Sequence, residues 1–134
     1  MTPRETSFKG STIFLVDDEP SWLELMGEIL RTEGFRVITA ETGETALENL
    51  RTVKPDLILS DLRMPSMNGF DFFEKVRHIP KLNSVPFVFM SSIDDIDAKR
   101  VAKQIGADGY VTKPFDSREA RSVVSELLTQ FENR

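Results

Sequence analysis

The chain has 134 residues, no cysteine and a formal net charge of −5. This length suffices for one domain with a hydrophobic core, and the lack of cysteine excludes disulfides, thiol catalysis and cysteine zinc sites. The acidic balance argues against nucleic acid as a direct ligand, because phosphate backbones favour clustered Lys and Arg, and the single His78 cannot form a histidine metal site alone.

Residues 1–11 are expected to form a flexible tail, and residues 12–134 a single domain. The tail carries charges and no apolar core, so it is neither a signal peptide nor an anchor. No apolar run approaches the roughly 20 residues that a membrane-spanning helix needs. We therefore expect a cytoplasmic protein that does not contact a membrane.

In the first half of the chain, short apolar runs alternate with apolar residues at helical spacing. A strand is predicted at residues 13–16, because a short continuous apolar run is typical of a strand buried on both faces. Further strands are predicted at residues 35–40 and 57–61. Pro20 is well placed to begin the first helix, which Gly34 ends. Thr42 opens the second helix.

The second half repeats this scheme. A loop at residues 64–69 precedes a helix whose phenylalanines we interpret as packing, and strands are predicted at 87–90 and 110–112. Asp94 is a plausible cap for the fourth helix, and Asp116 with Glu119 forms a plausible capping box for the last. The charged residues of the fourth helix are interpreted as a solvated face: Asp94, Asp95, Asp97, Lys99 and Arg100.

Five strand–helix units in strict alternation predict an α/β fold with a parallel sheet covered by helices on both faces. In such sheets, ligands gather at the carboxyl ends of the strands. The polar residues expected at these ends come from four strands: Asp17, Asp18, Asp61, Ser91 and Lys113.

These groups suit one kind of chemistry. Three carboxylates held together repel one another, and a hard cation such as Mg²⁺ relieves the repulsion. Because Mg²⁺ typically takes one or two carboxylates and keeps several waters, a carboxylate oxygen is left to attack phosphorus. Lys113 can then pair with a phosphoryl oxygen and the Ser91 hydroxyl can donate to another, so the pattern indicates phosphoryl transfer.

Four motifs occur in order: Phe14-Leu15-Val16-Asp17-Asp18-Glu19-Pro20, Ser60-Asp61-Leu62-Arg63-Met64-Pro65 followed by Met67-Asn68-Gly69-Phe70, Met90-Ser91-Ser92, and Tyr110-Val111-Thr112-Lys113-Pro114-Phe115. With these motifs, the chain from about Ile13 to its end resembles the receiver domains of two-component response regulators. One fragment alone would be weak, but all four at these distances make a specific signal.

The resemblance implies a flavodoxin-like, doubly wound sheet with strand order 2-1-3-4-5. It implies that Asp61 accepts a phosphoryl group from a phosphohistidine on a sensor histidine kinase or histidine phosphotransfer protein. It also implies a Mg²⁺ site formed by Asp17, Asp18, Asp61 and the main-chain carbonyl of Arg63. In the family the Lys113-Pro114 peptide bond is usually cis, and Tyr110 corresponds to a switch residue that follows the movement of Ser91.

The resemblance further implies an output face formed by the fourth helix, fifth strand and fifth helix, through which a homodimer can form. Arg63 and Ile93 border the expected path of attacking water, which suggests slow loss of the phosphoryl group. Trp22 lies close enough to the acidic pair to serve as a fluorescence reporter.

Two other functions remain open. One is a degenerate receiver that binds partners without phosphorylation, although such domains usually lose the acceptor or the lysine. The other is a Mg²⁺-dependent phosphatase of the haloacid dehalogenase type, disfavoured because Asp17-Asp18-Glu19-Pro20 lacks that class's Asp-x-Asp spacing. The chain is not expected to be an enzyme beyond its own phosphorylation and dephosphorylation. The sequence leaves open whether it acts alone or belongs to a longer regulator.

Overall fold

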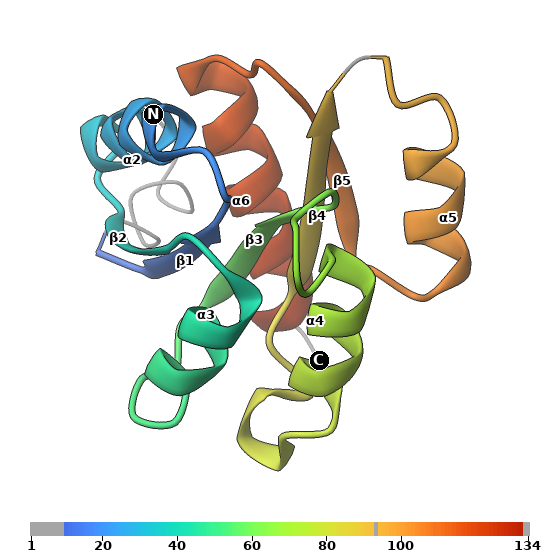
Figure 1. Cartoon of the computed structure of the whole chain (residues 1–134). Coiled ribbons are helices and arrows are strands. Elements are labelled where there is room, and N and C mark those ends of the chain that lie inside the picture. Colours follow the sequence, from blue (N-terminus) through green and yellow to red (C-terminus); the bar gives the residue numbers. More distant parts are fainter. Residues whose placement is uncertain (1–9, 93, 133–134) are drawn as a thin grey trace.

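The computed structural model describes residues 10–92 and 94–132. Within these residues, five parallel strands form one sheet in the order β2-β1-β3-β4-β5 (Figure 1). The elements run in the order β1 (Thr12–Val16), α2 (Pro20–Thr32), β2 (Arg36–Ala40), α3 (Gly43–Asn49), β3 (Leu57–Asp61), α4 (Gly69–Arg77), η1 (Pro80–Leu82), β4 (Phe87–Ser92), α5 (Ala98–Gln104), β5 (Gly109–Lys113) and α6 (Ser117–Glu132). The predicted flavodoxin-like order is thus confirmed.

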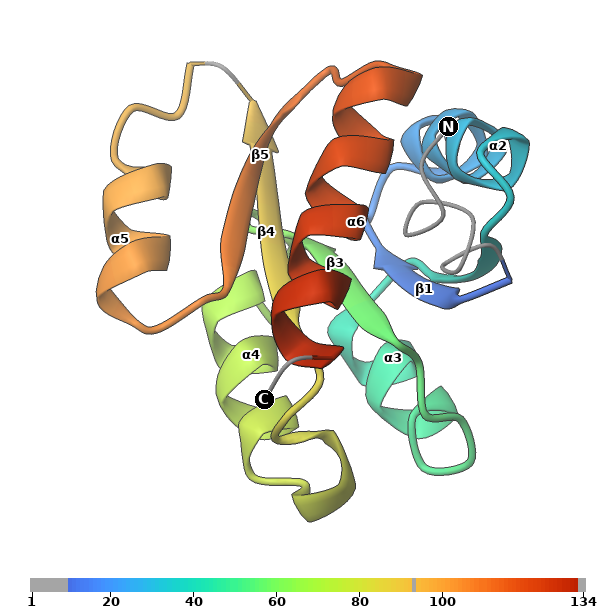
Figure 2. The ribbon, with the colours of Figure 1, turned by 180° about the vertical axis from the view of Figure 1, so that it is seen from behind.

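Helices cover both faces of the sheet. Alternate residues of a strand point to opposite faces, so Ile13 and Leu15 of β1 pack in the core beneath α2 and α6. Phe14 and Val16 pack in the second core, which α3, α4 and α5 cover. The two opposite views show α6 behind the sheet in Figure 1 and in front of it in Figure 2. The three central strands, β1, β3 and β4, are therefore buried on both sides, which explains their continuous apolar sequences, whereas the edge strands β2 and β5 are only partly buried.

The register of the strands aligns their carboxyl ends. Val16 of β1 lies opposite Ser60 of β3, and Asp61 lies opposite Met90 of β4. Ser92 of β4 lies opposite Lys113 of β5. Residues at or just after these strand ends are thereby brought to one edge of the sheet.

Side-chain caps begin several of the helices. The Thr42 hydroxyl accepts a hydrogen bond from the backbone N–H of Thr45 at 3.0 Å, which confirms the predicted cap of α3. The Asp116 carboxylate accepts one from the N–H of Glu119 at 2.9 Å, as predicted for α6. The Asn68 side chain also caps α4, which was not among the predicted caps.

The predicted Asp94 cap is wrong. Helix α5 begins at Ala98, and its cap position is Asp97, which makes no side-chain capping bond. The preceding residues form tight turns, in which the N–H of Asp95 donates to the carbonyl of Ser92 at 3.1 Å. These turns extend the loop and delay the helix by several residues.

The phenylalanines pack as predicted. Phe72 and Phe73 of α4 are buried, and the Phe73 and Phe87 rings lie 4.9 Å apart in an edge-to-face contact. Phe70 lies at the margin of this cluster, 5.5 Å from the Phe89 ring. These rings fill the core between α4 and the sheet.

The predicted tail lies outside the described residues as far as residue 9. The N–H of Gly10 donates to the carbonyl of Gly34, and the N–H of Arg36 donates to the carbonyl of Ser11. These two bonds tie residues 10–11 to the start of β2. Among the helices that the structure describes, none is long and apolar enough to cross a membrane.

Candidate phosphoryl-transfer site

Three carboxylates meet where β1 and β3 end. Oxygen atoms of Asp17, Asp18 and Asp61 all lie within 4.8 Å of one another. Asp17 is fully buried and Asp61 is 5% exposed, whereas Asp18 is half-buried. Asp17 is held by its own backbone N–H, which donates to Ala40, and by its Oδ1, which accepts from the N–H of Glu19. The predicted acidic cluster therefore forms.

Lys113 reaches this cluster from the end of β5. Its Nζ lies 2.9 Å from Asp17 Oδ2 and 3.4 Å from Asp61 Oδ1. The following peptide bond, Lys113-Pro114, is cis, as predicted. The same Nζ lies 5.3 Å from the centre of the Trp22 ring, so the only tryptophan of the chain contacts the site directly.

One ammonium does not neutralise this cluster. Burial, together with the charge of Asp17, raises the pKa of Asp61 from 3.8 to about 6, although Lys113 opposes the rise. Burial alone would lower the pKa of Lys113, but the hydrogen bond to Asp17 and the charge of Asp61 raise it instead. The Lys113 side chain therefore stays protonated and positively charged in the site. The Asp61 carboxylate is nevertheless still disfavoured when it is ionised.

The donor set fits Mg²⁺. Hard carboxylate oxygens from separate elements lie close together, and their mutual repulsion favours a divalent cation. Asp17, Asp18 and Asp61 are the side chains that would hold it. The main-chain carbonyl of Arg63, two residues beyond Asp61, stays a predicted fourth ligand.

Ser91 lies at the end of β4 and is 2% exposed. Its hydroxyl donates to Asp95 Oδ2 at 2.9 Å. Asp95 also accepts two hydrogen bonds from Arg63, from Nε at 2.7 Å and from a terminal nitrogen at 2.9 Å. The side chain of Asp95 is only 13% exposed, so its interpretation as part of a solvated helix face is wrong.

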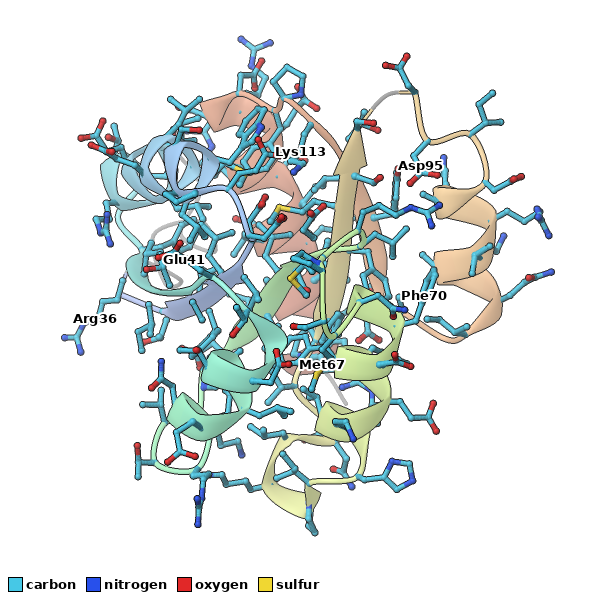
Figure 3. The ribbon with its side chains drawn as sticks, in the orientation of Figure 1. Arg36, Glu41, Met67, Phe70, Asp95 and Lys113 are labelled. Atoms are coloured by element: carbon cyan, nitrogen blue, oxygen red, sulfur yellow. The ribbon has the colours of Figure 1, made fainter. Side chains whose placement is uncertain are left out.

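In the sequence, Asp95 stands in a run of charged residues. Such a run usually marks a solvated surface, so the charge pattern alone does not place Asp95 at the site. A weak signal existed, since Arg63 follows the acceptor by two residues and Asp95 follows Ser91 by four. Figure 3 shows Lys113 and Asp95 at the same end of the molecule, at the carboxyl edge of the sheet.

Tyr110 of β5 is partly buried and packs against the core beneath α3, α4 and α5. Burial raises its pKa, and the Ser91 hydroxyl opposes that rise, whereas the charge of Asp95 adds to it. Tyr110 lies opposite Phe89 in the β4–β5 register, and Ser91 follows Phe89 by two residues on the same face of β4, so Tyr110 lies near Ser91. Ile93, the other residue expected to border the path of water, lies outside the described residues.

A family model for the response regulator receiver domain matches residues 13–125. The chain belongs to this family. It is 36% identical over 120 residues to the alkaline phosphatase synthesis transcriptional regulatory protein PhoP of Bacillus subtilis. The matched region covers 90% of this chain and 49% of that protein. The chain thus spans about half the length of this relative, and less of some others.

Solved receiver structures share the fold. A putative response regulator from Chloroflexus aurantiacus superposes with a TM-score of 0.85 at 30% identity, covering 90% of this chain and 99% of that one. The receiver domain of the sensor histidine kinase PA1611 from Pseudomonas aeruginosa superposes with a TM-score of 0.81 at 26% identity, covering 90% and 98%. That second structure has a magnesium ion coordinated in its active-site cleft. The chain is therefore a receiver domain of two-component signalling.

Proposed function

We propose that this receiver domain accepts a phosphoryl group on Asp61 from a phosphohistidine, carried by a sensor histidine kinase or a histidine phosphotransfer protein. The observation that carries the proposal is the position of Asp61. Its carboxylate ends a buried strand, lies beside the acidic pair and contacts the Lys113 ammonium at 3.4 Å. The raised pKa of about 6 still leaves this carboxylate mostly ionised, and hence nucleophilic, at neutral pH.

In the proposed reaction, an oxygen of Asp61 attacks phosphorus and the phosphorus–nitrogen bond of the donor breaks. The imidazole leaves with the bonding electrons and takes up a proton. Lys113 lies where its ammonium can pair with a phosphoryl oxygen, and Asp17 holds the ammonium there at 2.9 Å. Mg²⁺ bound by the acidic cluster would neutralise charge that develops on the transferring group.

The output would act through the surface formed by α5, β5 and α6. A groove there is lined by Lys99, Tyr110, Arg118 and Glu119 among others, so Tyr110 is shared between this surface and the Ser91–Asp95 pair. A change at Ser91 can therefore reach a partner-binding face through one side chain. Pairing of two copies through this face, and a cytoplasmic location beside the phosphohistidine donor, belong to the same proposal.

The proposal is tested with phosphoramidate, a small donor that contains a phosphorus–nitrogen bond. With Mg²⁺, we expect the intact protein to gain the mass of one phosphoryl group, and removal of Mg²⁺ by EDTA should prevent the gain. Asp61→Asn should not react. Asp71→Asn is the matched control, because Asp71 is an exposed aspartate in the first turn of α4, and it should react like the wild type.

Two results would contradict the proposal. If the wild type gains no phosphoryl group, the chain is better described by the degenerate, phosphorylation-independent alternative. If Asp61→Asn still gains one, the acceptor is another residue. The phosphatase alternative has lost its support, because the chain belongs to the receiver family.

A further inference from the structure

Asp95 binds two side chains that flank the phosphoacceptor. It accepts the hydroxyl hydrogen of Ser91 at 2.9 Å and the guanidinium of Arg63 at 2.7 and 2.9 Å. The Ser91 side chain is buried and that of Asp95 is 13% exposed, whereas Arg63 is 66% exposed. This three-residue cluster, Arg63–Asp95–Ser91, connects the loop after β3 to the loop after β4.

Ser91 has fewer hydrogen-bond donors to share in this cluster than Arg63 has. A serine hydroxyl has one hydrogen to donate, and here it goes to Asp95. A guanidinium has five N–H donors, of which Asp95 engages two, so Arg63 can keep Asp95 and still bind another anion. A phosphoryl group on Asp61 can therefore bind Arg63 while Arg63 still binds Asp95. It can accept the Ser91 hydrogen only if Asp95 gives that hydrogen up.

We propose that Asp95 is a positioning residue that retains the Ser91 hydroxyl in the unphosphorylated receiver and so opposes the switch. The inference rests on the proposed phosphoacceptor function. Arg63 fixes the Asp95 carboxylate through two parallel bonds, which keeps its oxygen in place for Ser91. The phosphoryl group must compete with the ionised Asp95 carboxylate for the Ser91 hydrogen. Breaking the Ser91–Asp95 bond therefore reduces the free energy that Ser91 contributes to binding the phosphoryl group.

The release of Ser91 has a route to the output surface. Tyr110 of β5 lies opposite Phe89, which shares its face of β4 with Ser91, and the backbone N–H of Ala98, the first residue of α5, donates to the carbonyl of Asp95 at 3.2 Å. A shift of Asp95 therefore acts on β5 and on the start of α5 together. Both elements border the groove of the proposed output face.

Asp95 could instead serve only to begin α5. Its carbonyl accepts a hydrogen bond from the N–H of Ala98 at 3.2 Å, and its carboxylate lies near the same N–H. Asparagine caps helices about as well as aspartate, so Asp95→Asn keeps a capping role while it removes the charge that binds Arg63 and Ser91. A purely structural role predicts no gain in affinity at Asp61 from this substitution.

The experiment measures the affinity of beryllofluoride, a mimic of the acyl phosphate, in saturating Mg²⁺ by Trp22 fluorescence. We expect Asp95→Asn to bind it about three- to tenfold more tightly than the wild type, the worth of one weakened hydrogen bond to a charged group. Mg²⁺ affinity without beryllofluoride should not change. Asp97→Asn is the matched control, because Asp97 lies in the same loop but pairs with Arg100 at the surface and not, among the described residues, with Ser91, and it should bind like the wild type.

Removing a negative charge could also favour any anion, and a second background separates the two causes. In Ser91→Ala, where no hydroxyl can be retained, Asp95→Asn should no longer increase beryllofluoride affinity. A gain that persists in this background would overturn the inference, as would an Asp95→Asn affinity equal to or weaker than that of the wild type. A wild type that binds no beryllofluoride would overturn the phosphoacceptor function and this inference together.

Discussion

At Asp61, burial and charge oppose the stability of the fold. The pKa of this carboxyl is raised from 3.8 to about 6, chiefly by burial and then by Asp17. The folded protein therefore binds a proton here more tightly than the unfolded chain does. As the pH rises from about 4 to about 6, the carboxyl ionises in the unfolded chain before it does so in the folded protein, and the free energy of unfolding falls. Above that range the ionised carboxylate destabilises the folded state by a constant amount. The site thus carries an energetic cost that a bound cation would offset.

Asp61→Asn is expected to raise the free energy of unfolding at neutral pH. One pKa unit corresponds to 1.36 kcal/mol, so a rise of about two units allows an increase of at most about 3 kcal/mol in the free energy of unfolding. Denaturant titrations at several pH values, without Mg²⁺, measure it. The gain should disappear below about pH 4, where the wild-type carboxyl is protonated in both states. A gain that does not vary with pH, or a loss of stability, would contradict this origin.

Most site residues could be predicted from the sequence because strand ends fix their positions. Asp17, Asp61 and Lys113 follow or end buried apolar runs, and parallel strands bring such ends together. Asp95 could not be predicted. Its side chain direction depends on the turns that follow β4, and a charge run alone does not reveal which acid turns inward.

The loop between β3 and α4 is fitted closely against the end of β3. A Cβ atom added to Gly69 would lie 2.5 Å from the carbonyl oxygen of Asp61, 2.9 Å from Leu62 Cα and 3.1 Å from the Phe89 ring. The first two are backbone atoms, which cannot move without shifting the strand end. Gly69 therefore lets α4 begin directly against Asp61, the proposed phosphoacceptor.

Gly69→Ala is expected to destabilise the protein by about 1–3 kcal/mol, the usual cost of overpacking, and to slow phosphorylation because the Asp61 backbone must shift. Thermal or denaturant unfolding and the rate with phosphoramidate measure the two effects. Gly27→Ala is the control, since its added Cβ would meet only the flexible end of Arg31, and a helical alanine is favoured over glycine. Equal behaviour of the two variants would contradict the close fit at Gly69.

Element boundaries followed from the sequence where a local signal decides them. Pro20 begins α2, and the side chains of Thr42 and Asp116 cap α3 and α6. The start of α5 did not follow, because Asp94 resembles a cap locally while the turns over the next residues consume the hydrogen bonds that a helix would use. Competition between neighbouring turn and helix bonds is not visible in a pattern of residue types.

At the scale of the whole molecule, the site joins two separately packed layers. Trp22 from α2 belongs to one core and contacts Lys113, whereas Tyr110 packs against the other. Both cores are filled by large buried side chains, so the sheet is a rigid support for the polar groups at its carboxyl edge. This arrangement confines the proposed switch to the edge where Asp61, Ser91 and Asp95 lie.

The most direct test of the central claim is to identify the phosphorylated residue chemically. After reaction with phosphoramidate and Mg²⁺, borohydride reduces an aspartyl phosphate to homoserine, which peptide mass spectrometry locates. We predict homoserine at position 61 alone, and its absence when either the donor or Mg²⁺ is left out. Homoserine at another aspartate, or none in a wild-type protein that is folded and binds Mg²⁺, would contradict the account.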